Sequence, residues 1–341
     1  MNQTSMQAVK TDSRFDVLKF AMAMMIVALH TMLWPDVLLP WLRIAVPVFF
    51  IISSYFFFKK VNKATSSREA RSYLLVFVKR SAILYLFWFV VLLIPTIIMR
   101  RWFDYGFLPG VAKMVLGILF DSSFVASWFI TANIIGTCVI FYFRRFKIVG
   151  FILGLALYLV CCASSSYYGA FPGFNSWLTE AFPGYCFYSS FPAAILWIWM
   201  GEMASRISNT GKWKLWLVVT VIGAVMLFLE YRMVMSHNWV RDNDSLVSLI
   251  ILCPAVFMLT KSLPATYFAN SIILRKSSII FYCVHGTMAR MILYYFRTKG
   301  EDSDWVGVFT FCVTTAVCVF ATWLLLTLAQ RRGWKWLKYA Y

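Results

Sequence analysis

The chain has 341 residues, of which 61% are hydrophobic and only 13% are charged. Soluble globular domains are close to half apolar and about a quarter charged, so this composition excludes a soluble protein and indicates a membrane protein. The formal net charge of +18 does not indicate nucleic-acid binding, because the basic residues lie in short segments between long apolar stretches.

Apolar stretches of about 20 residues recur along the chain, and each is long enough to cross the hydrocarbon core of a bilayer. The backbone inside a bilayer must satisfy its own hydrogen bonds, and the sequence lacks the alternating pattern of a membrane barrel. We therefore predict an all-α, polytopic membrane helix bundle of about ten transmembrane helices. The predicted spans are residues 15–34, 38–58, 79–99, 124–143, 148–166, 184–204, 213–233, 245–262, 274–296 and 305–328.

These spans form one transmembrane domain, residues 14–330, between a short polar tail at 1–13 and a basic tail at 331–341. With the N-terminus inside, most of the 32 lysine and arginine residues fall in inner segments. The positive-inside rule then predicts cytoplasmic N- and C-termini in a multi-pass protein of the inner (cytoplasmic) membrane. Residues 107–120 are apolar but short, and a crossing there would destroy the charge asymmetry. We expect them to form an amphipathic helix in the outer interface.

The eight cysteines lie within apolar stretches or at their edges, and the sequence contains no CxxC motif. A buried cysteine behaves as a small hydrophobic residue. We therefore expect neither a disulfide framework nor a metal site.

The first span contains two ionisable residues, Lys19 and His30. Burying a lysine in hydrocarbon costs about 2.5–3.5 kcal/mol, and helical geometry puts both residues on nearly one face, about 16 Å apart. His30 is either a packed, hydrogen-bonded residue or a general base that takes a proton from a hydroxyl. Lys19 either snorkels to the inner headgroups or faces an anionic donor from the cytoplasm, with Asp16 as its local partner.

The second span carries Arg43 near its predicted outer end and the pair Ser53 and Ser54 deeper inside. Arg43 either snorkels outward or belongs to a functional site at the level of His30. The two serines favour close helix packing, and a nucleophilic serine would lack a GxSxG elbow.

Lys79 and Arg80 are expected to open the third span on the inner side, after a turn at 65–67 and an amphipathic helix at 68–80. They either anchor the span by their positive charge or clamp the phosphates of a donor such as coenzyme A.

Later spans offer further polar side chains. Trp128 is expected in an aromatic belt or, with Asn133, in the lining of a cavity. Glu202 is expected to pair with a cation at the inner end of its span. His285 and Arg290 are two ionisable residues in one span, which favours a functional cavity.

Several of these segments resemble the integral-membrane acyltransferases of family 3, which include many bacterial O-acetyltransferases. Lys19 and His30 fill the family pattern of Arg or Lys, ten residues and His, and residues 16–19 resemble its D-x-L-[RK] start. Residues 43–56 are similar to its R-x-x-V-P-x-F-F-x-I-S-G-Y-L motif, with Ser54 in place of the glycine. Residues 128–129 and 281–285 look like its W-[FY] and I-Y-x-x-H segments, whereas Lys79-Arg80 only approximates the R-x-R of many members.

The resemblance implies transfer of an acyl group, usually acetyl, from acyl-coenzyme A to a sugar hydroxyl of an envelope polysaccharide or glycolipid. His30 would then be the base and Arg43 would support the site, while Lys19, Lys79 and Arg80 would bind the donor phosphates. Acetyl-CoA is expected as a donor substrate rather than a bound cofactor, with membrane lipids as surroundings. The alternative is a transporter or flippase for a lipid-linked glycan or small anion, since such proteins also use intramembrane Lys, His and Arg. A purely structural subunit would have no use for these buried ionisable groups.

Overall fold

The computed structural model describes residues 12–32, 38–101, 103–104, 106–120, 124, 127–208, 211–268, 270–301, 303–331 and 333–341. Every regular element in these ranges is helical, as predicted. The α-helices are α1 (Arg14–His30), α2 (Leu39–Leu42), α3 (Ala45–Val61), α4 (Ser67–Val91), α5 (Leu93–Arg100), α6 (Phe107–Phe120), α7 (Trp128–Phe143), α8 (Lys147–Ser164), α9 (Pro172–Ala181), α10 (Pro192–Arg206), α11 (Trp213–Ser236), α12 (Leu249–Ser262), α13 (Ser271–Thr298) and α14 (Asp304–Gln330). Three short 3₁₀ helices are η1 (Tyr168–Ala170), η2 (Phe187–Ser189) and η3 (Lys335–Ala340).

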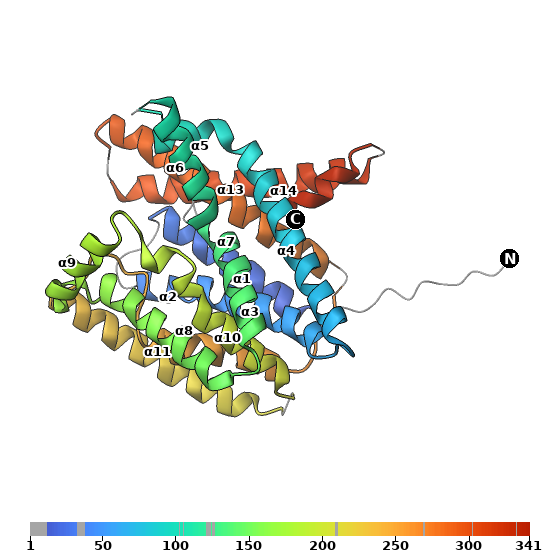
Figure 1. Ribbon diagram of the computed structural model, residues 1–341. Coiled ribbons are helices and arrows are strands. Elements are labelled where there is room, and N and C mark those ends of the chain that lie inside the picture. The colour runs from blue at the N-terminus through green and yellow to red at the C-terminus, as the bar shows by residue number, and fades with distance from the viewer. Residues whose placement is uncertain are drawn as a thin grey trace.

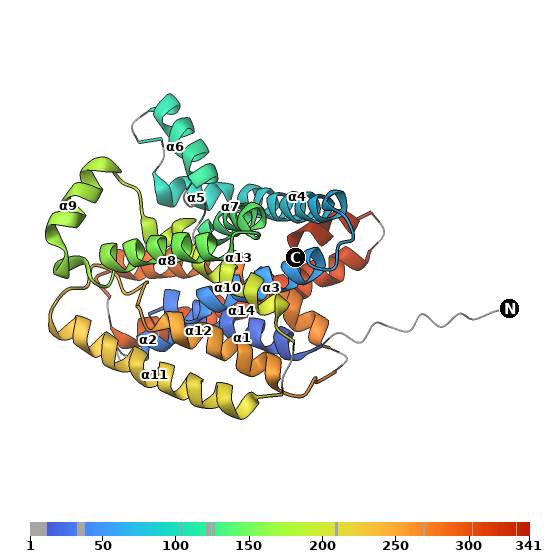
Figure 2. The ribbon, with the colours of Figure 1, turned by 60° about the horizontal axis from the view of Figure 1, so that its bottom comes forward.

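Helices α1 and α3 lie near the centre of the bundle, with α11 and α12 on one side of them and α4 on the other (Figures 1 and 2). The closest helix pairs are α3 with α10, α1 with α13, and α11 with α12. Helix α6 projects away from the bundle (Figure 2), and Phe107 and Leu108 at its start are largely exposed. A helix over residues 107–120 is therefore confirmed, while its place in the membrane interface stays a prediction.

Six helices of the described residues are long and apolar enough to cross a membrane: 39–61, which combines α2 and α3, α4, α8, α11, α13 and α14. The apolar helices α6, α7 and α12 are shorter. The protein is thus a polytopic helical bundle, and the count of ten spans stays a prediction. The predicted end of the first span, at Trp34, and nearly all of the N-terminal tail lie outside the described residues.

Two predicted spans are each broken into two helices by a proline. The second span divides at Arg43 and Ile44, because Pro47 has no N–H to bond the carbonyl of Arg43. The third span, expected at 79–99, divides at Leu92, between α4 and α5, because Pro95 cannot bond the carbonyl of Val91. The first of these breaks gives Arg43 a position between two helices.

Lys79 and Arg80 do not begin a helix, while their place at the inner boundary of the membrane stays a prediction. Helix α4 begins at Ser67 and continues to Val91, so both residues lie more than three turns inside it. The Ser66 side chain accepts a hydrogen bond from the Glu69 backbone N–H, and this N-cap starts the helix at the predicted turn. No glycine or proline interrupts the chain between Ser67 and Val91, so the amphipathic segment and the span form one helix.

Two helices begin later than the spans predicted for them. The sixth was expected from residue 184, but α10 begins at Pro192, which suits the first turn of a helix and not its interior. The preceding residues form a turn and η2. The eighth was expected from residue 245, whereas α12 begins at Leu249.

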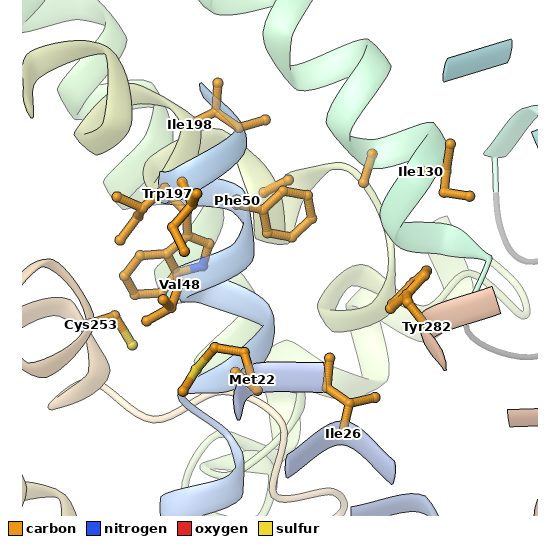
Figure 3. Close-up of a cluster of buried hydrophobic side chains, with 14 of the residues drawn as sticks. Met22, Ile26, Val48, Phe50, Ile130, Trp197, Ile198, Cys253 and Tyr282 are labelled. Carbon is orange, nitrogen blue, oxygen red and sulfur yellow. The ribbon is translucent and has the colours of Figure 1, made fainter. Parts of the chain in front are cut away.

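The core lies where α1, α3 and α10 meet. Figure 3 shows part of it, with Met22, Ile26, Val48, Phe50 and Trp197 in one cluster of buried side chains. Gly201 of α10 lies against α3, and a Cβ atom there would clash with the Ser54 hydroxyl and lie 2.5 Å from the Ile51 carbonyl oxygen. Ser54 is buried and its hydroxyl donates to the Phe50 carbonyl, a geometry that agrees with the packing interpretation of this residue.

Candidate functional site

His30 is the last residue of α1 and lies partly exposed at the wall of a cavity of about 90 Å³. This His30 cavity is lined by residues of several helices and by residues 244–245, and its lining includes His30, Arg43, Phe50, Trp128, Tyr188 and Asp244. The ring is thus not sealed among apolar side chains. A proton acceptor at the end of a helix, facing a cavity with polar and aromatic walls, can reach a hydroxyl of a bound molecule.

Arg43 also lines the His30 cavity, as the prediction of a shared level requires. Its guanidinium binds the carboxylates of Asp242 and Asp244, which follow α11 in the chain. The Arg43 Nε atom is buried and has no hydrogen-bond partner among the described residues. The carboxylates therefore hold the guanidinium in place while one N–H remains available.

His285 of α13 lies beside His30, with the two ring centres 5.1 Å apart. It is fully buried, and its Nδ1 atom is 2.8 Å from the Phe281 carbonyl oxygen. A histidine of α1 and a histidine of α13 thus lie side by side. The sequence marked each of them as a candidate in its own span but did not predict that they would be neighbours.

A second cavity, of about 490 Å³, lies between α3, α4 and the C-terminal segment. This basic cavity is lined by hydroxyl and cationic side chains as well as apolar ones, and its polar members include Ser53, Lys60, Tyr73, Arg80, Lys338 and Tyr341. The C-terminal segment lies against α4, where the Trp88 indole N–H donates to the Ala340 carbonyl at 3.0 Å. Three cations around a large open cavity suit an anionic ligand.

The predicted phosphate-binding residues are only partly brought together. Arg80 lines the basic cavity, whereas Lys79 is exposed on α4 and does not line it. Lys19 does not line it either, but its Nζ lies 5.4 Å above the ring of Phe56, which does. Lys79 and Arg80 diverge because adjacent residues of a helix are about 100° apart.

The expected pairing of Asp16 with Lys19 is corrected by the structure. Both carboxylate oxygens of Asp16 accept hydrogen bonds from Arg275 of α13, at 2.7 and 2.9 Å. Helix α13 packs along α1, so a long arginine from the neighbouring helix reaches the carboxylate. Glu202 pairs with Arg206 one turn later, as expected.

Asn133 and Ser53 connect α7 to α3, with the Asn133 amide donating to the Ser53 hydroxyl at 2.9 Å. One turn from Ser53, Phe50 packs against Trp128 and Phe129, at ring-centre distances of 5.9 and 4.3 Å. We call Phe50, Trp128 and Phe129 the aromatic wall. Trp128 lines the His30 cavity, and Asn133 is bonded to Ser53, which lines the basic cavity.

Four residues that line the two cavities were not predicted from the sequence: Lys60, Lys338, Tyr188 and Asp244. Lys60 and Lys338 belong to basic runs that also serve the positive-inside rule, so their charge alone carried no further signal. The sequence did offer a signal for Asp244. It lies next to the outer end of a predicted span, where a carboxylate can pair with an intramembrane arginine. Within the described residues, no group of three or more His, Cys, Asp or Glu residues could hold a metal ion.

Comparison with known proteins gives two matches. A protein-family model described as an acyltransferase domain matches residues 12–327. An amino-acid racemase from Enterococcus faecalis is 27% identical in an alignment of 172 residues that covers 46% of this chain and 22% of the racemase. The chain thus spans less than a quarter of that relative's length. No solved structure matches.

Proposed function

The chain belongs to acyltransferase family 3, whose model it matches from residue 12 to residue 327, and we propose that it is a membrane O-acyltransferase. An acyl group, acetyl in the first instance, moves from acyl-coenzyme A to a sugar hydroxyl of a cell-envelope polysaccharide or glycolipid. The protein crosses the inner membrane about ten times with both termini in the cytoplasm, and residues 14–330 form the acyltransferase unit.

The observation that carries this proposal is that one turn of α3 contributes to the lining of two different cavities. Ser53 lines the basic cavity and Phe50, three residues earlier, lines the His30 cavity. Three residues of helix rise about 4.5 Å, so α3 contributes to both cavities within one turn, and in this proposal the aromatic wall lies between the donor site and the site with the base. A thioester held in one cavity needs a short passage to meet a hydroxyl in the other.

The donor is assigned to the basic cavity because its charge and size suit coenzyme A. Lys60, Arg80 and Lys338 offer cations for the phosphates, and the apolar walls suit the pantetheine arm. By the positive-inside rule this end of the bundle faces the cytoplasm, where acyl-coenzyme A is found. Lys19, next to Phe56, adds positive charge behind the wall of this cavity.

The acceptor is assigned to the His30 cavity, at the opposite end of α1. His30 removes the proton from the acceptor hydroxyl as its oxygen attacks the thioester carbonyl. The new C–O bond forms, the C–S bond breaks, and the proton on His30 passes to the departing thiolate of coenzyme A. Arg43, fixed by Asp242 and Asp244, supports the negative charge that develops on the carbonyl oxygen.

The test uses the full chain in lipid nanodiscs, with acetyl-coenzyme A and a membrane glycan fraction from a strain that lacks the gene. Release of free thiol and a gain of one acetyl mass on the glycan are measured together. We expect His30→Ala to lower transfer at least about 100-fold while leaving thermal stabilisation by acetyl-coenzyme A unchanged.

The matched control is His237→Ala, which removes an exposed histidine at the end of α11. Full activity of His30→Ala, with normal protein levels, would contradict the assignment of the base. A transporter or flippase would show neither stabilisation by acetyl-coenzyme A nor acetylated glycan, so this result would favour that alternative.

A further inference from the structure

We propose that His285 is a positioning residue, whose Nε2 atom accepts the N–H of His30 and thereby directs the basic nitrogen of His30 into the cavity. This inference rests on the proposed function, in which His30 is the base. It adds a second histidine that acts on His30 and not on the substrate.

The tautomer of His285 follows from its hydrogen bond. Nδ1 of His285 lies 2.8 Å from the carbonyl oxygen of Phe281, one turn earlier on α13. A carbonyl can only accept, so Nδ1 must carry a proton and donate it. In the neutral ring, Nε2 then has a free lone pair and can only accept.

The lone pair on Nε2 has no other use within the described residues. His285 is 0% exposed, and its Nε2 has no hydrogen-bond partner there. Buried polar atoms in proteins are nearly always bonded, so an unpartnered acceptor at a candidate site needs a donor. A histidine that served packing alone would gain nothing from keeping this acceptor free.

His30 is placed to be that donor. The two ring centres are 5.1 Å apart and the ring planes are inclined by 43°. Each ring nitrogen lies about 1.1 Å from its ring centre, so two nitrogens that point at each other come to about 2.9 Å, a normal hydrogen-bond distance. Rotation of the His30 ring is enough to form this bond, because α1 and α13 already pack side by side.

The consequence for catalysis is the choice of tautomer at His30. The nitrogen that faces His285 keeps its proton, and the other nitrogen presents its lone pair to the cavity. In many hydrolases a carboxylate orients the base in this way. Here the carboxylate that lines the cavity, Asp244, is bound to Arg43, so a neutral acceptor takes the place of a carboxylate.

The charged and titratable groups around His30 come from several elements. His285 and Arg290 of α13, and Arg43 between α2 and α3, interact with it electrostatically. Asp244, Tyr158 and Tyr188 line the same cavity. The pH profile of the reaction therefore depends on His30 and on all of these neighbours. Each neighbour is tested by substituting it alone while the others remain unchanged.

The first test is spectroscopic and needs no activity. The chain has three histidines, so full-length protein in nanodiscs with ¹⁵N-labelled imidazoles gives three ring systems. His237→Gln and His30→Gln assign them. We expect His285 with Nδ1 protonated and Nε2 free of a proton, and His30 in a single tautomer. In His285→Asn, we expect His30 to become a mixture of both tautomers.

The second test compares two variants of His285 in the transfer assay. The amide of Gln reaches the position of Nε2 and can accept there, whereas the amide of Asn reaches only the position of Nδ1. We expect His285→Gln to keep kcat within about tenfold and His285→Asn to lower it about 100-fold, with the KM for acetyl-coenzyme A unchanged in both.

The outcomes separate the two proposals. Equal activity of the Gln and Asn variants, or a proton on Nε2 of His285 in the wild type, overturns the role of His285. An inactive wild type contradicts the proposed function, and the labelled spectra still decide which nitrogen of His285 bears the proton.

Discussion

Asp16 of α1 and Arg275 of α13 form a two-point ion pair, with nitrogen–oxygen distances of 2.7 and 2.9 Å. Asp16 is 3% exposed, so its carboxylate depends on this partner. The pair fixes α1, which ends at His30, against α13, which carries His285. The pair lies in the first turns of both helices, and the register between His30 at the end of α1 and His285 in the middle of α13 follows from it.

Loss of the arginine should be costly for stability. Arg275→Ala leaves a buried carboxylate without its partner, and we expect a loss of about 3 kcal/mol, the low end for a broken buried pair, because Arg275 itself is partly exposed. Equilibrium unfolding in mixed micelles measures it. Adding Asp16→Asn to this variant should recover part of the loss, and additive losses would show that the two residues do not depend on each other.

Binding of the donor should distinguish two adjacent basic residues. Arg80→Ala removes a cation from the basic cavity, and we expect the KM for acetyl-coenzyme A to rise about tenfold. Lys79→Ala is the matched control, since Lys79 is exposed outside the cavity and should change the KM less than twofold. Equal effects of the two substitutions would mean that α4 acts only through its overall charge.

The aromatic wall should keep water in the His30 cavity from hydrolysing the thioester of acetyl-coenzyme A in the basic cavity. Phe50→Ala removes the ring that packs against Trp128 and Phe129. We expect hydrolysis of acetyl-coenzyme A without acceptor to rise about fivefold while transfer to glycan falls, because the cavities become continuous to water. Thiol release with and without glycan measures both rates. Leu86→Ala, exposed on α4, serves as the control, and unchanged hydrolysis in Phe50→Ala would remove the barrier role.

The contact between α10 and α3 should tolerate no side chain at Gly201. A methyl group there meets the Ser54 hydroxyl and the Ile51 carbonyl, so the helices must separate. We expect Gly201→Ala to destabilise the protein by about 1–3 kcal/mol, as overpacking does. Gly173→Ala in α9 meets nothing within 4 Å and should be neutral or slightly stabilising. Thermal melts of both variants in the same lipid decide this, and equal melting temperatures would contradict the close approach.

Local chemistry was readable from the sequence, because it depends on residues near one another in the chain. Apolar stretches predicted helices, a turn was predicted at 65–67 where α4 begins, and His30 and Arg43 were recognised as ionisable groups in apolar surroundings. The helix breaks at Pro47 and Pro95 also depend on local sequence. They were not predicted, because the spans were placed by hydropathy alone. The family resemblance lay in the same short segments and is confirmed by the match to residues 12–327.

The distant partners were decided by tertiary structure. Asp16 bonds to Arg275 and His30 lies beside His285, although each pair is far apart in sequence. Likewise, Arg80 and Lys338 line the same cavity. Hydropathy fixes that a helix lies in a bilayer, but nearly every face of such a helix is apolar, so periodicity does not say which face meets which neighbour. Side-chain size and close contacts such as that at Gly201 select the packing, and the packing creates the cavities.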